Sequence, residues 1–114
     1  MRTSTTLAGL LLAVGLALPT VTATATSVTG GGATAWSPAR GDSGRIAVKD
    51  GSRDSDPAKA EYFRTASSDR KRTLWNHNGT HTTVYSGDGS KIFKFKACDE
   101  NFGSRDDCSG WAYN

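Results

Sequence analysis

Polar and apolar residues alternate along much of the chain beyond residue 40, with a period of two. This period is typical of short β-strands, because successive side chains of a strand point to opposite faces. Clusters of Gly, Asp, Asn, Ser and Pro separate the alternating stretches, and beyond residue 25 no stretch shows a helical period. The pattern predicts antiparallel strands at about residues 45–49, 59–65, 71–77, 80–86 and 91–98.

The pair Asn78-Gly79 lies between two of these stretches and is a strong hairpin signal. In a two-residue hairpin Trp75 and Val84 would share one face, while Leu74 and Tyr85 would share the other. Each face would then carry one aliphatic and one aromatic residue. The pattern therefore leaves open which face of the hairpin is buried.

The fold class expected from these strands is all-β, a small antiparallel sandwich or meander of about five strands with one disulfide. This β-rich domain is expected over residues 44–114. Residues 26–43 are rich in Gly, Ser, Thr and Ala, which predicts a flexible leader. Trp36 within it is a candidate to dock on the domain, since a lone exposed tryptophan is uncommon.

Residues 1–25 have the pattern of a Sec-type signal peptide. Arg2 precedes an apolar run over residues 7–18, and small-residue cleavage sites follow at Ala23 and Ala25. The run is shorter than the roughly 20 residues that span a bilayer. The sequence therefore predicts a secreted, extracellular protein without stable membrane anchoring.

Cys98 and Cys108 are the only cysteines of the chain. An oxidising exterior makes a disulfide between them the expected state. A metal site would need more ligands than two thiols, so no metal is predicted there. By the loop-entropy argument, closing so short a loop stabilises a domain by about 3 kcal/mol.

The formal net charge of +3 does not by itself indicate a partner. Residues 91–96 alternate lysine with aromatic side chains, as some single-stranded nucleic-acid binders do. In a strand, however, Phe93 and Phe95 would lie on the face opposite Lys94 and Lys96. The stretch therefore predicts a half-buried strand with a solvated lysine face, and no nucleic-acid partner.

No recognisable catalytic group stands out, and we expect no enzymatic activity and no cofactor. Residues 41–44, Gly-Asp-Ser-Gly, occur around the nucleophile of chymotrypsin-like proteases, but His77 and His81 follow Ser43 instead of preceding it. A Gly/Asp/Ser turn is the expected role. On the predicted hairpin the two histidines face opposite sides, which argues against a shared metal ion. Acidic residues at 50–56 and 99–107 leave calcium binding open.

Residues 93–98 (FKFKAC) followed by residues 108–111 (CSGW) resemble the ending of small exported proteins of actinobacteria. In that group a β-rich domain closes with an amphipathic strand, a cysteine, a short loop and a Cys-Ser-x-Trp ending. The resemblance implies a β-rich fold and export. No activity is established for the group, so the resemblance supplies no catalytic residues.

Aromatic residues are more numerous than a small core needs, and exposed rings on a sheet suit sugar stacking. We expect a non-enzymatic extracellular binding module for a polysaccharide or cell-wall ligand. The alternative is a secreted inhibitor or interaction protein that uses the loop between Cys98 and Cys108 against another extracellular protein. The oligomeric state stays open. The candidate ligand-binding residues are Trp75, Tyr85, Tyr62 and Trp111.

Overall fold

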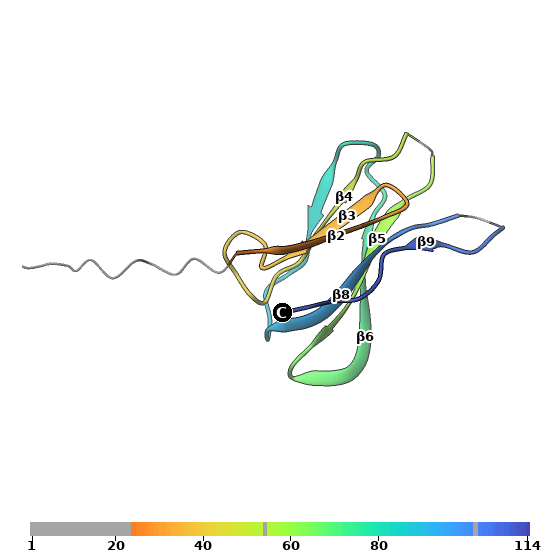
Figure 1. The fold of residues 1–114 in the computed structure, drawn as a ribbon. Helices are drawn as coiled ribbons and strands as arrows, with labels where there is room; N and C mark the ends of the chain where they lie inside the picture. Colours follow the sequence, from red (N-terminus) through yellow and green to blue (C-terminus); the bar gives the residue numbers. More distant parts are fainter. Residues whose placement is uncertain (1–23, 54, 102) are drawn as a thin grey trace, which may run out of the picture.

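The computed structural model describes residues 24–53, 55–101 and 103–114. Over these ranges the chain is all-β, as predicted, and no segment forms an apolar helix long enough to cross a membrane. The strands pack as two antiparallel sheets, face to face (Figure 1). They are β2 (Thr26–Gly30), β3 (Ala33–Ser37), β4 (Ala47–Asp50), β5 (Ala58–Arg64), β6 (Ser67–Asn76), β7 (Thr83–Tyr85), β8 (Ile92–Asp99), β9 (Asp107–Cys108) and β10 (Ala112–Tyr113).

The five-stranded sheet has the order β10-β8-β5-β6, with β9 paired to the far end of β8. The four-stranded sheet has the order β2-β3-β4-β7. The strands expected at 45–49, 59–65 and 91–98 are confirmed, with small shifts at their ends, as β4, β5 and β8. The predicted disulfide between Cys98 and Cys108 is also present, and it joins β8 to β9.

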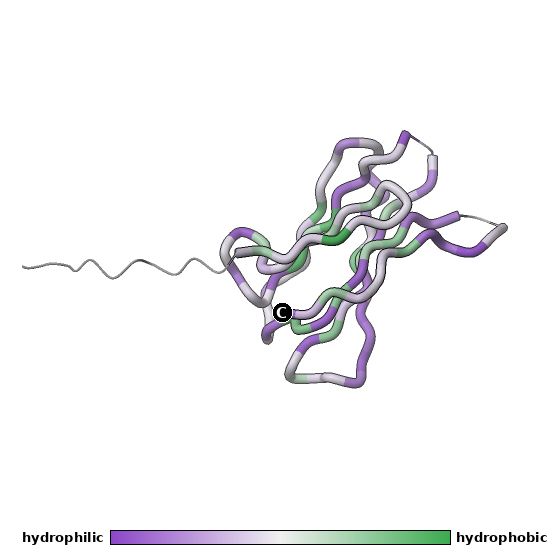
Figure 2. The backbone as a smooth tube through the Cα atoms, viewed as in Figure 1, coloured by the Kyte–Doolittle hydropathy of each residue, from purple (hydrophilic) through white to green (hydrophobic). Residues whose placement is uncertain are grey.

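The core lies between the two sheets, where the hydrophobic segments of both layers face each other (Figure 2). The period of two places small residues inward, as with Ala60 opposite Ala97 and Ala35 opposite Val48. The larger Tyr62 and Phe95 lie opposite each other and fill the remaining space. The core therefore contains few bulky side chains. The core cluster is Ala33, Ala35, Ile46, Val48, Ala58, Ala60, Tyr62, Ile92, Phe95, Ala97 and Ala112.

The prediction of a flexible leader over residues 26–43 is wrong, because this segment contains β2 and β3. Ala33 and Ala35 are fully buried, and they alternate with half-buried Thr34 and Trp36. Alanine among Gly, Ser and Thr is typical of linkers, which is why the sequence predicted one here. In the fold, the small alanine side chains let the two sheets pack closely. Trp36 docks as part of β3.

The predicted signal peptide lies almost wholly in residues 1–23, outside the described residues. Both predicted cleavage sites, Ala23 and Ala25, precede the first residue of β2. Cleavage at either site would leave every described strand intact.

The predicted hairpin at Asn78-Gly79 is wrong, because β6 and β7 belong to different sheets. β6 pairs with β5, whereas β7 pairs with β4. The predicted sharing of a face by Trp75 and Val84 is therefore also wrong: Trp75 lies opposite Lys59 of β5, and Val84 lies opposite Val48 of β4.

Asn76 explains the change of sheet. This residue is fully buried at the end of β6, and its Nδ2 donates hydrogen bonds to the carbonyls of Val48 at 3.3 Å and Thr82 at 2.8 Å. Its Oδ1 accepts from the backbone N–H of Asn78 at 2.9 Å. These bonds form a local side-chain turn that directs the chain toward the four-stranded sheet.

Candidate binding face

The outer face of the five-stranded sheet carries the largest group of aromatic and charged side chains that point away from the core. The register places Glu61 of β5 opposite Lys96 of β8, and Phe63 opposite Lys94. Because inward and outward residues alternate, these pairs lie on the face opposite the core. We call this surface the lysine–aromatic face. Its residues are Lys59, Glu61, Phe63, Trp75, Lys94, Lys96, Trp111 and Tyr113.

At one end of this face, Lys94 lies among three aromatic rings. Its Nζ is 5.2 Å from the ring centre of Phe63, 4.6 Å from that of Trp111 and 5.8 Å from that of Tyr113. The Nζ of Lys96 is also 4.6 Å from the Trp111 ring. These are cation–π distances, at which the ring faces attract the ammonium groups and hold them in place.

The relation between the lysines and the aromatics differs from the sequence expectation. Phe95 is buried in the core, opposite Lys94 and Lys96 as predicted. The pairing of β5 with β8 shifts register beside Phe63, and the ring of Phe93 lies 6.4 Å from that of Phe63. Rings from neighbouring strands thus lie beside the lysines, which the pattern of a single strand did not predict.

At the other end of the face, Trp75 presents its ring from the edge strand β6. The Nζ of Lys59 is 4.9 Å from the centre of this ring, and the His77 ring stacks on it at 5.3 Å with an interplanar angle of 15°. Trp75 is 39% exposed and Tyr113 is 65% exposed. In the described part of the chain these two are the exposed large hydrophobic side chains.

The two exposed rings lie at diagonally opposite corners of the face. Tyr113 is opposite Lys94, whereas Trp75 is opposite Lys59, which in turn is opposite Cys98. The rings are therefore separated by three strand spacings across the sheet and four residues along β8, or roughly 20 Å.

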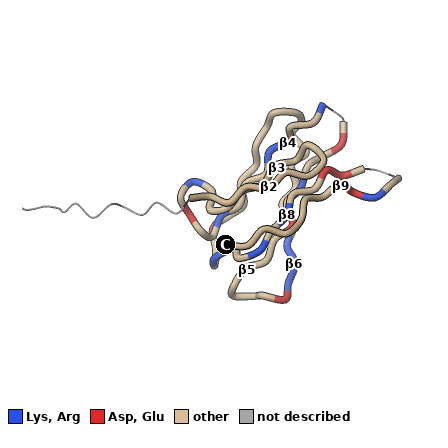
Figure 3. The backbone as a smooth tube through the Cα atoms, viewed as in Figure 1, with Lys and Arg blue, Asp and Glu red and all other residues tan. Residues whose placement is uncertain are grey.

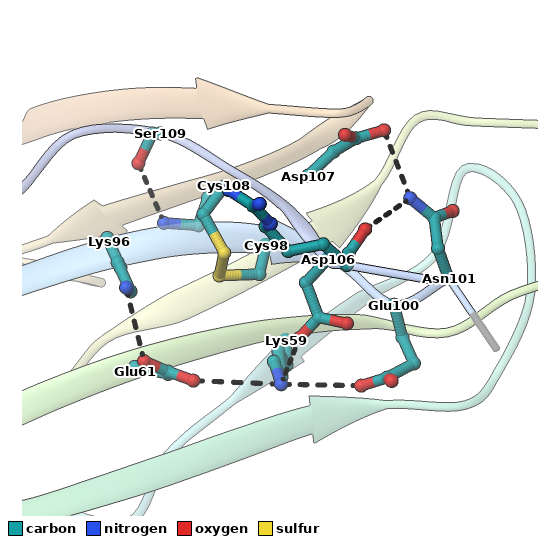
Figure 4. Close-up of a disulfide and its surroundings, with 12 residues drawn as sticks. Lys59, Glu61, Lys96, Cys98, Glu100, Asn101, Asp106, Asp107, Cys108 and Ser109 are labelled. Atoms are coloured by element: carbon teal, nitrogen blue, oxygen red, sulfur yellow. Dashed lines mark hydrogen bonds and ion pairs between the residues drawn. A yellow bond between two sulfur atoms is a disulfide. The ribbon is translucent and has the colours of Figure 1, made fainter. Parts of the chain in front are cut away.

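A network of ion pairs occupies the middle of the face (Figure 4). The carboxylate of Glu61 lies 3.2 Å from the Nζ of Lys71 and 3.6 Å from that of Lys96. A hollow of about 780 Å³ adjoins these side chains. Its lining is rich in groups that donate or accept hydrogen bonds, and includes Glu61, Lys71, Lys96, Arg105, Asp106 and Asp107.

Lys59 connects this network to the loop that the disulfide closes. Its Nζ lies 2.7 Å from Asp106, 3.3 Å from Glu100 and 3.6 Å from Glu61 (Figure 4). The hydrogen bond from Lys59 holds the pKa of Asp106 below its usual value, although partial burial acts in the opposite direction. Burial acts to lower the pKa of Lys59, but its hydrogen bonds to Asp106 and Glu100 outweigh burial and raise it.

The loop itself is held at several points besides the disulfide. The Nδ2 of Asn101 donates to the carbonyl of Arg105 at 3.2 Å and to the carboxylate of Asp107 at 3.1 Å. Ser109 accepts a hydrogen bond from the backbone N–H of Ala97 at 3.0 Å (Figure 4). Along the backbone, acidic residues gather beside β9, whereas basic residues follow much of β6 and β8 (Figure 3).

The structure places two of the four predicted ligand-binding residues on one face, at its opposite ends. Trp75 and Trp111 both lie on the lysine–aromatic face. Tyr62 is instead buried, 7% exposed, opposite Phe95 in the core. Tyr85 lies in the four-stranded sheet, where the guanidinium carbon of Arg40 is 4.0 Å from its ring centre.

Sequence reasoning missed Phe63, Lys94 and Tyr113 as residues of this face. Tyr113 belongs to the two-residue strand β10, which is too short to show a period of its own. Tyr113 follows Trp111 by two residues, and in an extended chain residues two apart point to the same side. This spacing was a weak indication that the two rings share a face. Lys94 could be placed beside rings only when the strands next to β8 were known.

The Gly-Asp-Ser-Gly stretch at residues 41–44 forms a turn, as predicted. Asp42 Oδ1 accepts from the backbone N–H of Gly44 at 2.8 Å, which is the main cause that lowers the pKa of Asp42. Arg45 Nε donates to Asp42 Oδ2 at 3.2 Å. His77 and His81 are exposed, and the described residues contain no group of three or more His, Cys, Asp or Glu side chains placed to hold a metal ion.

No protein-family model, curated protein or solved structure matches the chain. The resemblance of the C-terminal ending to small exported actinobacterial proteins therefore stays a prediction.

Proposed function

We propose that this protein is a secreted, non-catalytic binding module that holds a polysaccharide on its lysine–aromatic face. The observation that carries the proposal is the placement of two exposed rings, Trp75 and Tyr113, on one face of one sheet. Aromatic rings on an open surface offer flat apolar contact for the C–H faces of sugar rings.

The geometry of the face favours a polymer over a single sugar. The two rings are roughly 20 Å apart by the strand geometry, which is more than one sugar ring spans. Between them lies the ammonium group of Lys96, which suits hydrogen bonds with hydroxyl groups. A chain of several sugars would contact both rings and the polar middle at once.

An extracellular setting is supported by two observations. The cysteines of the described residues are paired as Cys98–Cys108, and such pairs persist in oxidising compartments. The predicted signal-peptide cleavage sites lie before β2, so removal of the predicted signal peptide would leave all the described strands in place.

Co-sedimentation of the oxidised mature protein with insoluble peptidoglycan, chitin and cellulose tests this function. We expect binding to at least one polymer, and we expect Trp75→Ala and Tyr113→Ala each to reduce the bound fraction severalfold. Tyr85→Ala is the matched control, because it removes a ring from the other sheet. Absence of binding to all three polymers, or an equal loss in the control, would contradict the proposal.

A protein-directed role for the loop between Cys98 and Cys108 is the second candidate. The loop projects from the sandwich beside β9 (Figure 1), and Arg105 in it is exposed while its carbonyl is held by Asn101. An exposed basic side chain on a braced backbone suits the substrate-like loop of a protease inhibitor. Inhibition of a trypsin-type protease that is lost in Arg105→Ala would support this role, and no inhibition would count against it.

A further inference from the structure

Lys94 differs from the other lysines of the five-stranded sheet in its electrostatic partners. Lys59, Lys71 and Lys96 each lie within 3.6 Å of a carboxylate oxygen. Lys94 forms no ion pair with any described residue, and its contacts are with the rings of Phe63, Trp111 and Tyr113. One positive charge at this end of the face is therefore uncompensated.

The rings give this ammonium a defined position without consuming its hydrogen bonds. A cation–π contact uses the ring faces, so the N–H donors of Lys94 stay available to a ligand. A positioned ammonium beside an exposed ring is suited to a ligand that combines an anionic group with a flat apolar surface. Charge-assisted hydrogen bonds to such an anion are stronger than those to a neutral hydroxyl.

The charges at the other end of the face determine where on the face an anionic group binds. Glu100 and Asp106 approach Lys59 near Trp75, and Asp107 follows Asp106 as the first residue of β9. These carboxylates repel an anion at the Trp75 end and leave the Lys94 end as the favourable place for negative charge.

We propose that the ligand is an anionic polysaccharide, in which a carboxylate or phosphate group binds Lys94 while a neighbouring sugar stacks on Tyr113. This inference rests on the proposed polysaccharide binding and specifies the chemical class of polymer. It assigns to Lys94 the recognition of charge and to Tyr113 the recognition of the sugar ring.

The decisive experiment compares matched polymer preparations with and without their anionic groups. Polygalacturonate and its fully methyl-esterified form share one backbone, and cell-wall sacculi before and after acid extraction of their phosphate polymers provide the corresponding phosphate pair. We expect the mature protein to bind the charged member of at least one pair about tenfold more tightly, as one charge-assisted hydrogen bond implies. The pair that shows the difference identifies carboxylate or phosphate as the group bound.

Variants of Lys94 test the assigned residue. Lys94→Gln is expected to abolish the preference for the charged polymer while keeping the weaker binding to the neutral one, and Lys94→Arg is expected to restore part of the preference. Lys71→Gln is the control, because that lysine already pairs with Glu61. If Lys94→Gln fails to fold, the salt dependence of wild-type binding serves instead, since the preference should decrease between 50 and 300 mM NaCl as added ions screen the charges.

The possible results separate the two proposals. Equal binding of charged and neutral polymers, unchanged in Lys94→Gln, would overturn the anionic ligand but keep polysaccharide binding. Loss of binding to every polymer tested would overturn both. Tighter binding of single-stranded oligothymidylate than of any polysaccharide would overturn the proposal in favour of a nucleic-acid ligand.

Discussion

The inner faces of both sheets are rich in alanine, with the bulkier Tyr62 and Phe95 on the five-stranded sheet, but the outer faces differ in chemistry. On the four-stranded sheet the outward residues are mostly small and hydroxylated, and the hydroxyls of Thr29 and Thr34 lie 2.9 Å apart. On the five-stranded sheet the outward residues are lysines, a buried glutamate and aromatic rings. The packing of the core does not fix the outward residues of either sheet. The difference between the two outer faces is therefore available for a binding function.

Both outer faces carry aromatic rings, but the exposed large rings of the described residues, Trp75 and Tyr113, lie on only one of them. Trp36 and Tyr85 lie on either side of Ala47, which is fully buried, and Arg40 covers the Tyr85 ring. These rings therefore cover their own sheet. Trp75 and Tyr113 remain exposed at the corners of the lysine–aromatic face. The number of aromatic residues is thus a poor guide to a site, whereas the exposed fraction of each ring in the fold is a better one.

Removing the disulfide should produce the largest effect and should act on the five-stranded sheet first. The double variant Cys98→Ser, Cys108→Ser is expected to lower the free energy of unfolding by about 3 kcal/mol, because the unfolded chain regains the entropy of an open loop. Denaturant unfolding followed by tryptophan fluorescence measures this loss. Hydrogen exchange should show β9 and β10 opening before β2 and β3, and the reverse order would contradict the assignment.

Replacing Asn76 tests what joins the two sheets, with a smaller expected effect. Asn76→Ala leaves the carbonyls of Val48 and Thr82 without their side-chain donor, so we expect a loss of about 2 kcal/mol. The exposed neighbour His77 provides the control variant, His77→Ala. Thermal or chemical unfolding of both variants checks the prediction. Equal stability of the two would show that the buried amide does not stabilise the connection between β6 and β7.

Protonation of Asp106 should weaken the contact between the disulfide-closed loop and the five-stranded sheet, and this is the smallest effect expected. Because the folded pKa of Asp106 lies below its usual value of 3.8, its stabilising contribution is present above that value and is lost as pH falls through the folded pKa. The contribution of Lys59 is present below its usual pKa of 10.5 and is lost as pH rises through the raised value.

Melting temperatures measured from pH 7 down to pH 2 check this prediction. Asp106→Asn should have a shallower acid decline than the wild type, while Asp69→Asn, at an exposed position of β6, is the control. An identical acid decline in Asp106→Asn and the wild type would show that the pair with Lys59 adds nothing to stability.

Local sequence features predicted the elements whose structure depends on near neighbours. The period of two located β5 and β8, and the pair of cysteines in an expected export product predicted the disulfide. The Gly-Asp-Ser-Gly stretch was correctly interpreted as a turn, because the Asp42 carboxylate and its partners lie within three residues of one another. In each case the determining contacts are close in sequence or set by composition.

The errors arose where a contact between distant residues outweighed the local signal. β3 forms because its alanines pack against the alanines of β5 and β8, and β2 then pairs with β3. The local composition of this segment, which is typical of linkers, gave no sign of these distant contacts. The Asn78-Gly79 signal is outweighed by Asn76, whose amide bonds the carbonyls of Val48 and Thr82.

The sequence by itself determined that the chain is all-β, that its strands are antiparallel and short, and that its two cysteines pair. Only the tertiary structure decided which rings meet the lysines, because that depends on which strands lie next to β8. Alternation assigns residues to shared faces within one strand, but the neighbours across a sheet come from long-range pairing. The buried guanidinium of Arg64 illustrates this, since it donates to the carbonyls of Gly44, Ser90 and Gly87, all far from it in sequence.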